Sequence, residues 1–354
     1  MTIHLFNPEH DIALASNLAN FTAPHAGRQL RADLGYLPAL WAEEGDTILV
    51  ENVEYAARTW ERLRRRLVSR LGTDRFLSGD EAFVTGKPSV SCGETDTVLP
   101  WGWDRAVRRE LERKGVPLTV MPSDAQLEGI RSLSHRQTAA QLLPLLQMEG
   151  TVGEALLCET VEMVEQQLRL HPRLVLKAPW SSSGRGIRFI DHELNDHQRG
   201  WLHNLLKSQG GVMAEPCYEK VKDFGMEFEA TDEGIRYLGL SLFHTANGAY
   251  TGNILATEDA KREMLSRYIP VGLLDDVKVK ICSTLSLNDY RGPFGIDMMV
   301  VRENGQRKLH PCVEINLRRT MGHVALTLSP TDDEIRYVMR IDYTGNYKLR
   351  IRKL

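Results

Sequence analysis

The sequence contains few cysteines, and those it has follow no metal-binding or disulfide pattern. They are five in number and include no CxxC pair: Cys92, Cys158, Cys217, Cys282 and Cys312. An odd and scattered set argues against a disulfide framework and against a structural zinc site. We therefore expect a reducing compartment and a cytoplasmic protein.

Long apolar runs are also lacking. No segment approaches the roughly 18 consecutive apolar residues that a membrane-spanning helix needs. Residues 1–16 show no basic stretch followed by an apolar run, the pattern of a signal peptide. We therefore expect neither a signal peptide nor a membrane partner.

Neither sign of charge is in excess. Lys and Arg together number 44, Asp and Glu together number 47, and the formal net charge is -3. Proteins that bind nucleic acid usually carry an excess of basic residues, so we expect no nucleic-acid partner. The P-loop pattern, in which Gly and four further residues precede Gly-Lys-Ser or Gly-Lys-Thr, does not occur in the sequence.

The chain is long enough for two or three packed units, because 354 residues exceed the size at which one hydrophobic core keeps growing. Residues 1–120 read as strands that alternate with helices, which predicts a small α/β domain with a largely parallel sheet. The strands are expected at residues 3–6, 47–50 and 118–121, and the helices at residues 53–71 and 103–114.

Beyond Pro122 the sequence becomes richer in strands, which predicts α+β lobes and no doubly wound repeat. Strands are expected at residues 174–177, 187–190, 212–214, 226–230, 235–242, 295–301 and 309–315. Helices are expected from about residue 123 and at residues 138–147, 160–171, 192–208, 256–267 and 272–287.

One stretch with chemical meaning joins two strands of this second part. The strand Leu174–Lys177 ends in a lysine, and the small residues of Ser181–Gly186 follow it. Small residues let backbone amides approach an anion, and a lysine at a strand end can lie over phosphate oxygens. The alternative is an ordinary Ser/Gly hairpin turn with a surface lysine.

A second stretch offers oxygen ligands. Asp297 interrupts an apolar strand, and Glu314 and Asn316 lie two apart on another, so their side chains share a face. Two carboxylates and an amide oxygen suit Mg²⁺ when phosphate completes its coordination. The alternative is a structural ion pair of Asp297 or Glu314 with Arg318 or Arg319.

Together these features resemble the ATP-grasp superfamily. The resemblance implies that Lys177 and the loop residues Ser183, Gly184 and Gly186 contact the nucleotide phosphates. The segment Val212–Tyr218 resembles the hinge of that family, which implies nucleotide contacts for Glu215 and Cys217. Asp223 takes the place of the acidic residue that holds the ribose.

The resemblance extends to the remaining ionic positions. Asp297, Glu314 and Asn316 match the metal ligands of the family, which implies Mg²⁺, with Mn²⁺ as an alternative. Arg318 matches the arginine of its E-x-N-x-R ending, which implies a catalytic role beside Lys177. Arg136 takes the place of the second basic residue near the phosphates.

The resemblance covers residues 122–330 and implies a fold in three parts. Residues 1–120 take the place of an N-terminal α/β pre-grasp domain. Residues 121–208 would form the first lobe of an α+β ATP-grasp fold. Residues 209–354 would form the second lobe with a C-terminal strand or tail. The sequence departs from the family at Trp180, in a loop that is usually richer in glycine, and at Leu317, where proline is usual.

The activity implied is ATP-dependent ligation. A small-molecule or peptide carboxylate would be activated as an acyl phosphate and joined to an amine, and a homo-oligomer is left open. One alternative is a kinase-like member that stops after phosphoryl transfer. Another is a nucleotide-binding regulatory protein that does no chemistry.

Three polar segments have two interpretations each. Asn7–Asp11 follows the first strand, where α/β sheets place ligand-binding loops, but His10 and Asp11 could simply cap a helix. Phe243–Asn253 could line an acceptor pocket or form a hairpin loop. His323 could contact substrate or fill the core.

Overall fold

The computed structural model describes residues 1–354 except 73–75, 80, 86–95, 182–185, 247–248 and 288–289. Its contacts divide the chain into two compact units. The first unit comprises Met1–Arg131, Gly252–Thr257 and Arg318–Leu354, and the second comprises Ser132–Thr251 and Glu258–Leu317. The first unit is therefore assembled from three separate segments, and the last of these was expected in the second lobe.

The first unit contains a four-stranded parallel sheet in the order β3-β2-β1-β4, as the alternation of strands and helices predicts. Its strands are short and largely buried: β1 (Thr2–Leu5), β2 (Thr47–Leu49), β3 (Phe83–Val84) and β4 (Thr97–Pro100). Since parallel strands end on the same edge, the segments after β1 and β4 lie together there. This edge positions Asn7–Asp11.

Several helices of this unit are amphipathic, and some begin at a side chain that caps the first turn. They are α1 (His10–Ser16), α2 (His25–Leu34), α3 (Val53–Leu71), α4 (Arg105–Arg113), most of α5 (Asp124–Leu133) and α11 (Met321–Leu328), with the 3-10 turns η1 (Leu37–Leu40) and η2 (Leu118–Val120). α3 has the predicted bounds because the Asn52 side chain caps its first turn and Gly72 ends it with φ 66°. The strand expected at residues 118–121 is wrong. No residue of η2 is buried, so no sheet covers this apolar run.

The C-terminal segment contributes two strands to the first unit. β14 (Tyr337–Tyr343) and β15 (Tyr347–Lys353) form an antiparallel hairpin, and β14 also pairs with the end of β11 (Ala249–Leu255) through Asn253 and Met339. Their buried faces join one hydrophobic core with residues from the N-terminal segment, Trp60 among them. The core of this unit therefore needs residues from both ends of the sequence.

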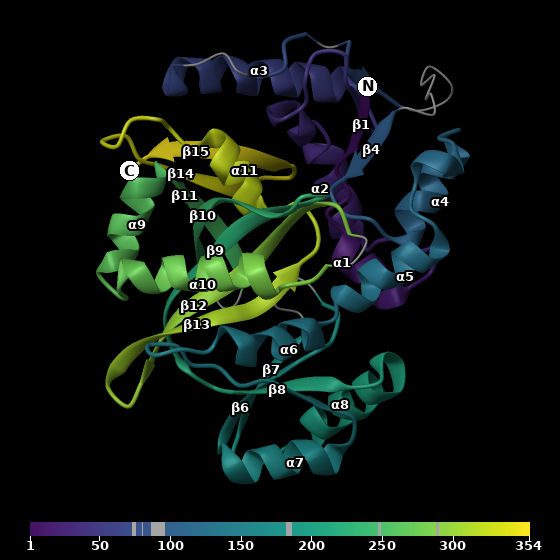
Figure 1. Ribbon diagram of the computed structural model, residues 1–354. Helices are drawn as coiled ribbons and strands as arrows, with labels where there is room; N and C mark the ends of the chain where they lie inside the picture. Colours follow the sequence, from purple (N-terminus) through teal and green to yellow (C-terminus); the bar gives the residue numbers. More distant parts are fainter. Residues whose placement is uncertain (73–75, 80, 86–95, 182–185, 247–248, 288–289) are drawn as a thin grey trace. The chain divides into compact units, whose positions relative to one another are not determined.

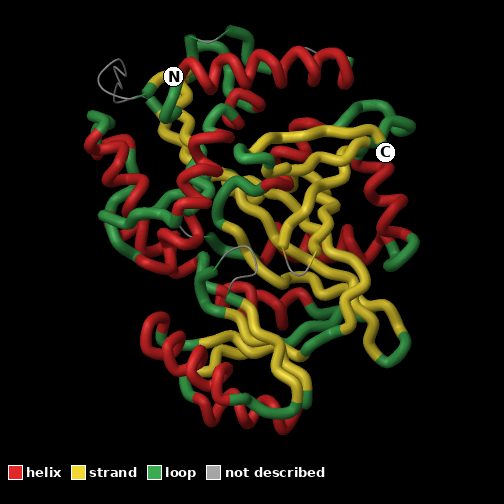
Figure 2. The backbone as a smooth tube through the Cα atoms, turned by 180° about the vertical axis from the view of Figure 1, so that it is seen from behind, coloured by secondary structure: helices red, strands yellow, loops and turns green. Residues whose placement is uncertain are grey.

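The second unit contains two antiparallel sheets. The first has four strands in the order β5-β8-β6-β7: β5 (Leu156–Cys158), β6 (Arg173–Lys177), β7 (Ile187–Asp191) and β8 (Val212–Pro216). Helices α7 (Val161–Leu170) and α8 (Asp196–Gln209) cover one face and share its core. Figures 1 and 2 show both helices on that side of the sheet.

The second sheet of this unit has longer strands in the order β13-β12-β9-β10. They are β9 (Glu219–Thr231), β10 (Gly234–Ala246), β12 (Gly292–Glu303) and β13 (Gln306–Asn316). Helix α6 (Arg136–Leu146) packs on β13, and helices α9 (Glu258–Ser266) and α10 (Val271–Thr284) pack on β10. In the described part of the chain, no helix is both long and apolar enough to cross a membrane.

Candidate active site

Lys177 is the last residue of β6 and is not a surface lysine. Its side chain is buried, and Nζ lies 2.6 Å from Oε2 of Glu215 on the neighbouring strand β8. Both charges are withdrawn from water, which is costly unless they are paired. The loop after Lys177 does join two antiparallel strands as a hairpin, but the alternative of a surface lysine is wrong.

The loop after β6 is closed at its base. The Ala178 N–H donates to the Gly186 carbonyl oxygen over 2.8 Å. Gly186 has no space for a side chain, because a Cβ atom there would overlap Ser181. Ser183 and Gly184, both expected to contact phosphate, lie outside the described residues.

Arg136 begins α6 and connects the loop to the second sheet. Its guanidinium donates to the Ala178 carbonyl oxygen, to Ser181 Oγ over 2.8 Å and to Glu314 Oε1 over 2.7 Å. The side chain is buried, so this network is shielded from solvent. Arg136 thus lies between the loop and a predicted metal ligand, in contact with both.

Asp297 and Glu314 are direct partners across the antiparallel pair of β12 and β13. Asn316 pairs with Gly295 two positions further along, and all three oxygen-bearing residues are half-buried. A divalent ion of the Mg²⁺ type needs one or two protein carboxylates when phosphates and water complete the shell, so this donor set fits it. Within the described ranges, no group of three or more His, Cys, Asp or Glu is placed to hold a metal ion.

Several of the predicted site residues act electrostatically on one buried thiol, that of Cys312. The pKa of Cys312 is raised first by burial, then by the charges of Asp297, Glu215 and Glu314, whereas Lys177 acts in the opposite direction. Charges on four strands therefore act on this one thiol. No role was predicted for Cys312, although it lies two residues before Glu314 on the same strand.

His310, earlier on the same strand, was also missed. It is buried, and neither ring nitrogen has a hydrogen-bond partner among the described residues. Burial, followed by the nearby charge of Lys177, lowers its pKa to about 3, so its ring is neutral at neutral pH. The His310 ring packs edge-on against the ring of Tyr218, with centroids 5.9 Å apart.

Asp223 and Cys217, both expected to contact the nucleotide, form hydrogen bonds with other protein groups. Asp223 on β9 accepts from Lys220 Nζ over 2.6 Å and from Thr245 Oγ1 over 2.7 Å. The Cys217 N–H donates to the Arg173 carbonyl oxygen over 2.9 Å, which continues the sheet beyond β8. Nucleotide binding by Asp223 and Cys217 stays a prediction.

Arg318 is counted with the first unit, where it binds Asp11. Its Nε and Nη2 lie 2.8 Å from the two carboxylate oxygens, a bidentate ion pair. Glu314, for which an ion pair with Arg318 or Arg319 was the alternative, pairs with Arg136. The catalytic role of Arg318 stays a prediction.

The remaining polar segments are now placed. The capping interpretation of His10 and Asp11 is wrong, because Glu9 occupies the N-cap of α1 without a side-chain hydrogen bond. Within residues 243–253, the described residues belong to strands β10 and β11. His323 fills the core, where it forms a capping box with Thr320.

Comparisons with known proteins found similarity among solved structures only. No family model matches the chain, and no curated protein matches it. Among solved structures, N5-carboxyaminoimidazole synthetase from Staphylococcus aureus is 14% identical, with 96% of this chain and 82% of that chain covered and a TM-score of 0.47.

Two further solved structures are similar to a comparable degree. An L-amino acid ligase from Bacillus licheniformis is 12% identical, with 69% of this chain and 61% of that chain covered and a TM-score of 0.40. A protein from Archaeoglobus fulgidus assigned to the ATP-grasp superfamily is 14% identical, with 100% and 99% covered and a TM-score of 0.43. The superfamily that the sequence motifs resemble is thus represented among the solved structures to which this chain is similar.

Proposed function

We propose that this chain is an ATP- and Mg²⁺-dependent ligase that joins a carboxylate to an amine. The observation that supports the proposal best is the buried Lys177–Glu215 pair together with the directly opposed residues Asp297 and Glu314, whose charges all act on Cys312. Paired carboxylates next to buried cations are what a site for a metal-bound triphosphate requires. In this proposal residues 1–120 are the pre-grasp domain, and residues 121–208 and 209–354 are the two lobes.

The proposed roles follow from charge. Lys177 and Arg136 balance phosphate charge, and Arg318 stabilises the transferring phosphoryl group. Ser181 and Gly186, the described residues of the loop, pack closely at its base, and the loop would help to exclude water. Glu215, Cys217 and Asp223 hold the nucleotide.

Asp297, Glu314 and Asn316 would hold Mg²⁺ or Mn²⁺. When bound, the ion would supply charge neutralisation at the phosphate oxygens. Arg136 contributes indirectly, because its bond to Glu314 orients that carboxylate toward its partner on β12.

The proposed reaction has two bond-forming steps. A carboxylate oxygen attacks the γ-phosphorus of ATP, which releases ADP and forms an acyl phosphate. An amine nitrogen then attacks the acyl carbon, loses a proton and releases inorganic phosphate. Such chemistry depends on alignment and charge stabilisation more than on covalent participation by the protein.

The test compares Asp297→Asn with the parent protein. We expect the parent to form ADP from Mg-ATP in the presence of a panel of amino acids and short peptides, and the variant to lose this activity. Glu303→Gln is the matched control, because Glu303 ends the same strand and its ion pair is with Lys308. Full activity in Asp297→Asn would refute the metal assignment.

The products identify the reaction class. Free phosphate together with an amide product indicates a ligase, whereas a phosphorylated product without amide formation indicates a kinase. If calorimetry detects no Mg-ATP binding to the parent protein, the nucleotide site itself is refuted.

A further inference from the structure

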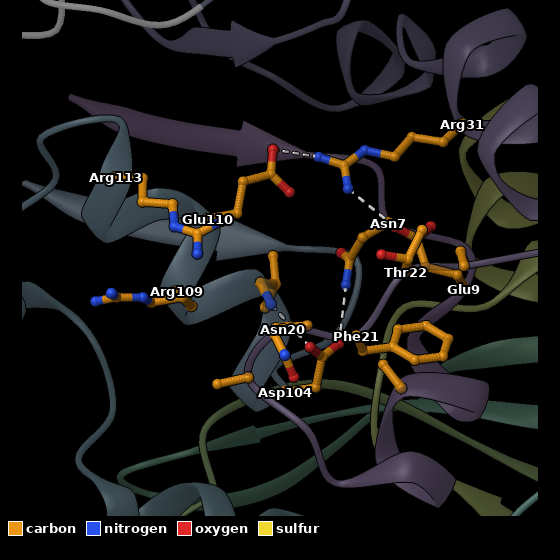
Figure 3. A pocket seen from close by; sticks show the side chains of 15 residues that line it. Asn7, Glu9, Asn20, Phe21, Thr22, Arg31, Asp104, Arg109, Glu110 and Arg113 are labelled. Atoms are coloured by element: carbon orange, nitrogen blue, oxygen red, sulfur yellow. Dashed lines mark hydrogen bonds and ion pairs between the residues drawn. The ribbon is translucent and has the colours of Figure 1, made fainter.

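A cavity lies wholly within the first unit, and its lining residues are far in sequence from the predicted metal ligands. It has a volume of about 250 Å³ and lies at the edge where β1 and β4 end. Figure 3 shows its charged and polar lining, which includes Asn7, Glu9, Arg31, Asp104, Arg109 and Glu110. The cavity is lined mainly by side chains that can form hydrogen bonds or ion pairs.

The inner wall is held by bonds between two loops. The Asn7 side chain donates to the Gly102 carbonyl oxygen over 2.8 Å and accepts from the Gly102 N–H over 3.3 Å. Asp104 is buried, caps α4 through the Val107 N–H over 2.8 Å, and lies 3.2 Å from His10 Nδ1. These contacts make the wall a rigid, preorganised surface.

One carboxylate oxygen of Glu9 lacks a hydrogen-bond donor among the described residues. Its Oε1 accepts from Arg31 over 2.9 Å, and Arg31 also binds Glu110 over 2.6 Å. The other oxygen, Oε2, is buried and has no hydrogen-bond partner among the described residues. Burial raises the pKa of Glu9 despite the neighbouring Arg31. A buried carboxylate oxygen without a donor needs an explanation, and a bound donor group provides one.

Charge changes sign along the cavity. The more buried side chains of the lining are three carboxylates, those of Glu9, Asp104 and Glu110, with the guanidinium of Arg31. The exposed part of the lining carries two arginines of α4, Arg109 and Arg113, and Arg109 Nη1 lies 2.5 Å from Glu112 Oε2. A ligand that matches this arrangement is positive at its inner end and negative at its outer end.

We propose that this cavity binds a small zwitterion with a primary ammonium group at one end and a carboxylate at the other. The ammonium donates to Glu9, and the carboxylate lies at Arg109 and Arg113. Pockets for drug-sized ligands have volumes of about 300–1,000 Å³, so this cavity suits a smaller molecule of amino-acid size. The inference does not depend on the nucleotide site, and its test contains no nucleotide.

The test uses saturation-transfer NMR on the full chain with linear ω-amino acids, from β-alanine to 6-aminohexanoate. We expect saturable binding of at least one member at millimolar concentration. Butanoate and butylamine each lack one of the two charges, so their affinity should be at least about tenfold lower. Equal binding of the singly charged comparators would overturn the proposal, as would no binding by any member.

Variants separate this role from a structural one. Glu9→Gln should weaken binding of the amino acids about tenfold, with a melting temperature at neutral pH that is unchanged or raised, because a costly buried charge is removed. Arg113→Ala should weaken the same ligands without affecting butylamine. Glu61→Gln is the matched control, since Glu61 pairs with Arg65 on α3 outside the cavity. Unchanged binding with a lower melting temperature in Glu9→Gln would show that Glu9 serves only its ion pair with Arg31.

Discussion

Lys177 and Glu215 show how a single residue can be required by both the fold and the proposed site. Taking two charges out of water costs several kcal/mol per ion, and their attraction offsets this cost only while both are present. Lys177 is buried against Glu215, so a substitution there bears on stability as well as on nucleotide binding.

We predict that Lys177→Ala lowers the free energy of unfolding by about 3–5 kcal/mol, because Glu215 is left buried and unpaired. The double variant Lys177→Met/Glu215→Gln carries no charge there and should recover most of this loss. If Lys177 also contacts phosphate, the double variant still fails to bind Mg-ATP in calorimetry. A double variant that recovers both stability and nucleotide binding would make Lys177 a structural residue.

The burial of His310 makes the free energy of unfolding depend on pH. Its pKa falls from 6.5 in the unfolded chain to about 3 in the fold, so the unfolded state binds more protons between these values. The stability of the fold that holds the His310 ring neutral is fully present above pH 6.5 and is lost as the pH falls toward about 3. The slope from this one group is at most about 1.4 kcal/mol per pH unit.

We therefore predict that His310→Leu has a flatter dependence of unfolding free energy on pH between 6.5 and 4 than the parent. Denaturant unfolding at a series of pH values measures it. Other groups that titrate in this range are common to both proteins and cancel in the comparison. Parallel curves for the two proteins would contradict a buried neutral His310.

The charged residues around Cys312 could be predicted because they interrupt apolar strands, where an unpaired charge is expensive. Their partners could not be predicted. Arg136 meets Glu314 and Arg318 meets Asp11 only after residues 178 and 307 positions apart are brought together by folding. Periodicity indicates the face on which a side chain lies, but tertiary packing decides what it contacts.

At the scale of elements, local signals were sufficient where the pattern and the caps agree. α3 begins after a capping asparagine and ends at a glycine in the left-handed region, so its bounds could be predicted. The C-terminal hairpin has a local signal in Gly345, whose φ is 86°, but β14 also pairs with a strand far from it in the sequence, β11. Gly252 on that strand approaches the Met339 carbonyl so closely that a side chain would overlap it.

We predict that Met339→Ala lowers the free energy of unfolding by about 2–5 kcal/mol, because Met339 is fully buried in the core of the first unit. Tyr343→Ala is the matched control on the same strand. Its side chain is exposed and contacts Tyr347, so the cost should be about 0.2–1 kcal/mol. Chemical denaturation of both variants measures the difference, and equal losses would mean that β14 does not complete this core.

At the scale of the whole molecule, the first unit is discontinuous in sequence. Its principal core combines Trp60 and its neighbours with Leu255, Val324, Met339 and Ile351. Composition and motif spacing cannot reveal such a return of the chain, because no local pattern distinguishes a strand of one unit from a strand of another.

We predict that a fragment of residues 1–131 does not fold cooperatively, because its apolar face lacks these distant residues. Thermal unfolding followed by circular dichroism should show no sigmoidal transition for the fragment and a clear one for the full chain. A well-dispersed NMR spectrum of the fragment would contradict this prediction and would support an independent N-terminal domain.

Because the core of the first unit needs residues near the C-terminus, it cannot be completed until the end of synthesis. Translation adds about 5–20 residues per second, so roughly ten to forty seconds separate the appearance of residue 131 from that of Ile351. Throughout this interval the nascent N-terminal segment carries an apolar surface whose partners do not yet exist. We expect the nascent chain to be prone to aggregation during this interval, and slower translation of the last codons would prolong it.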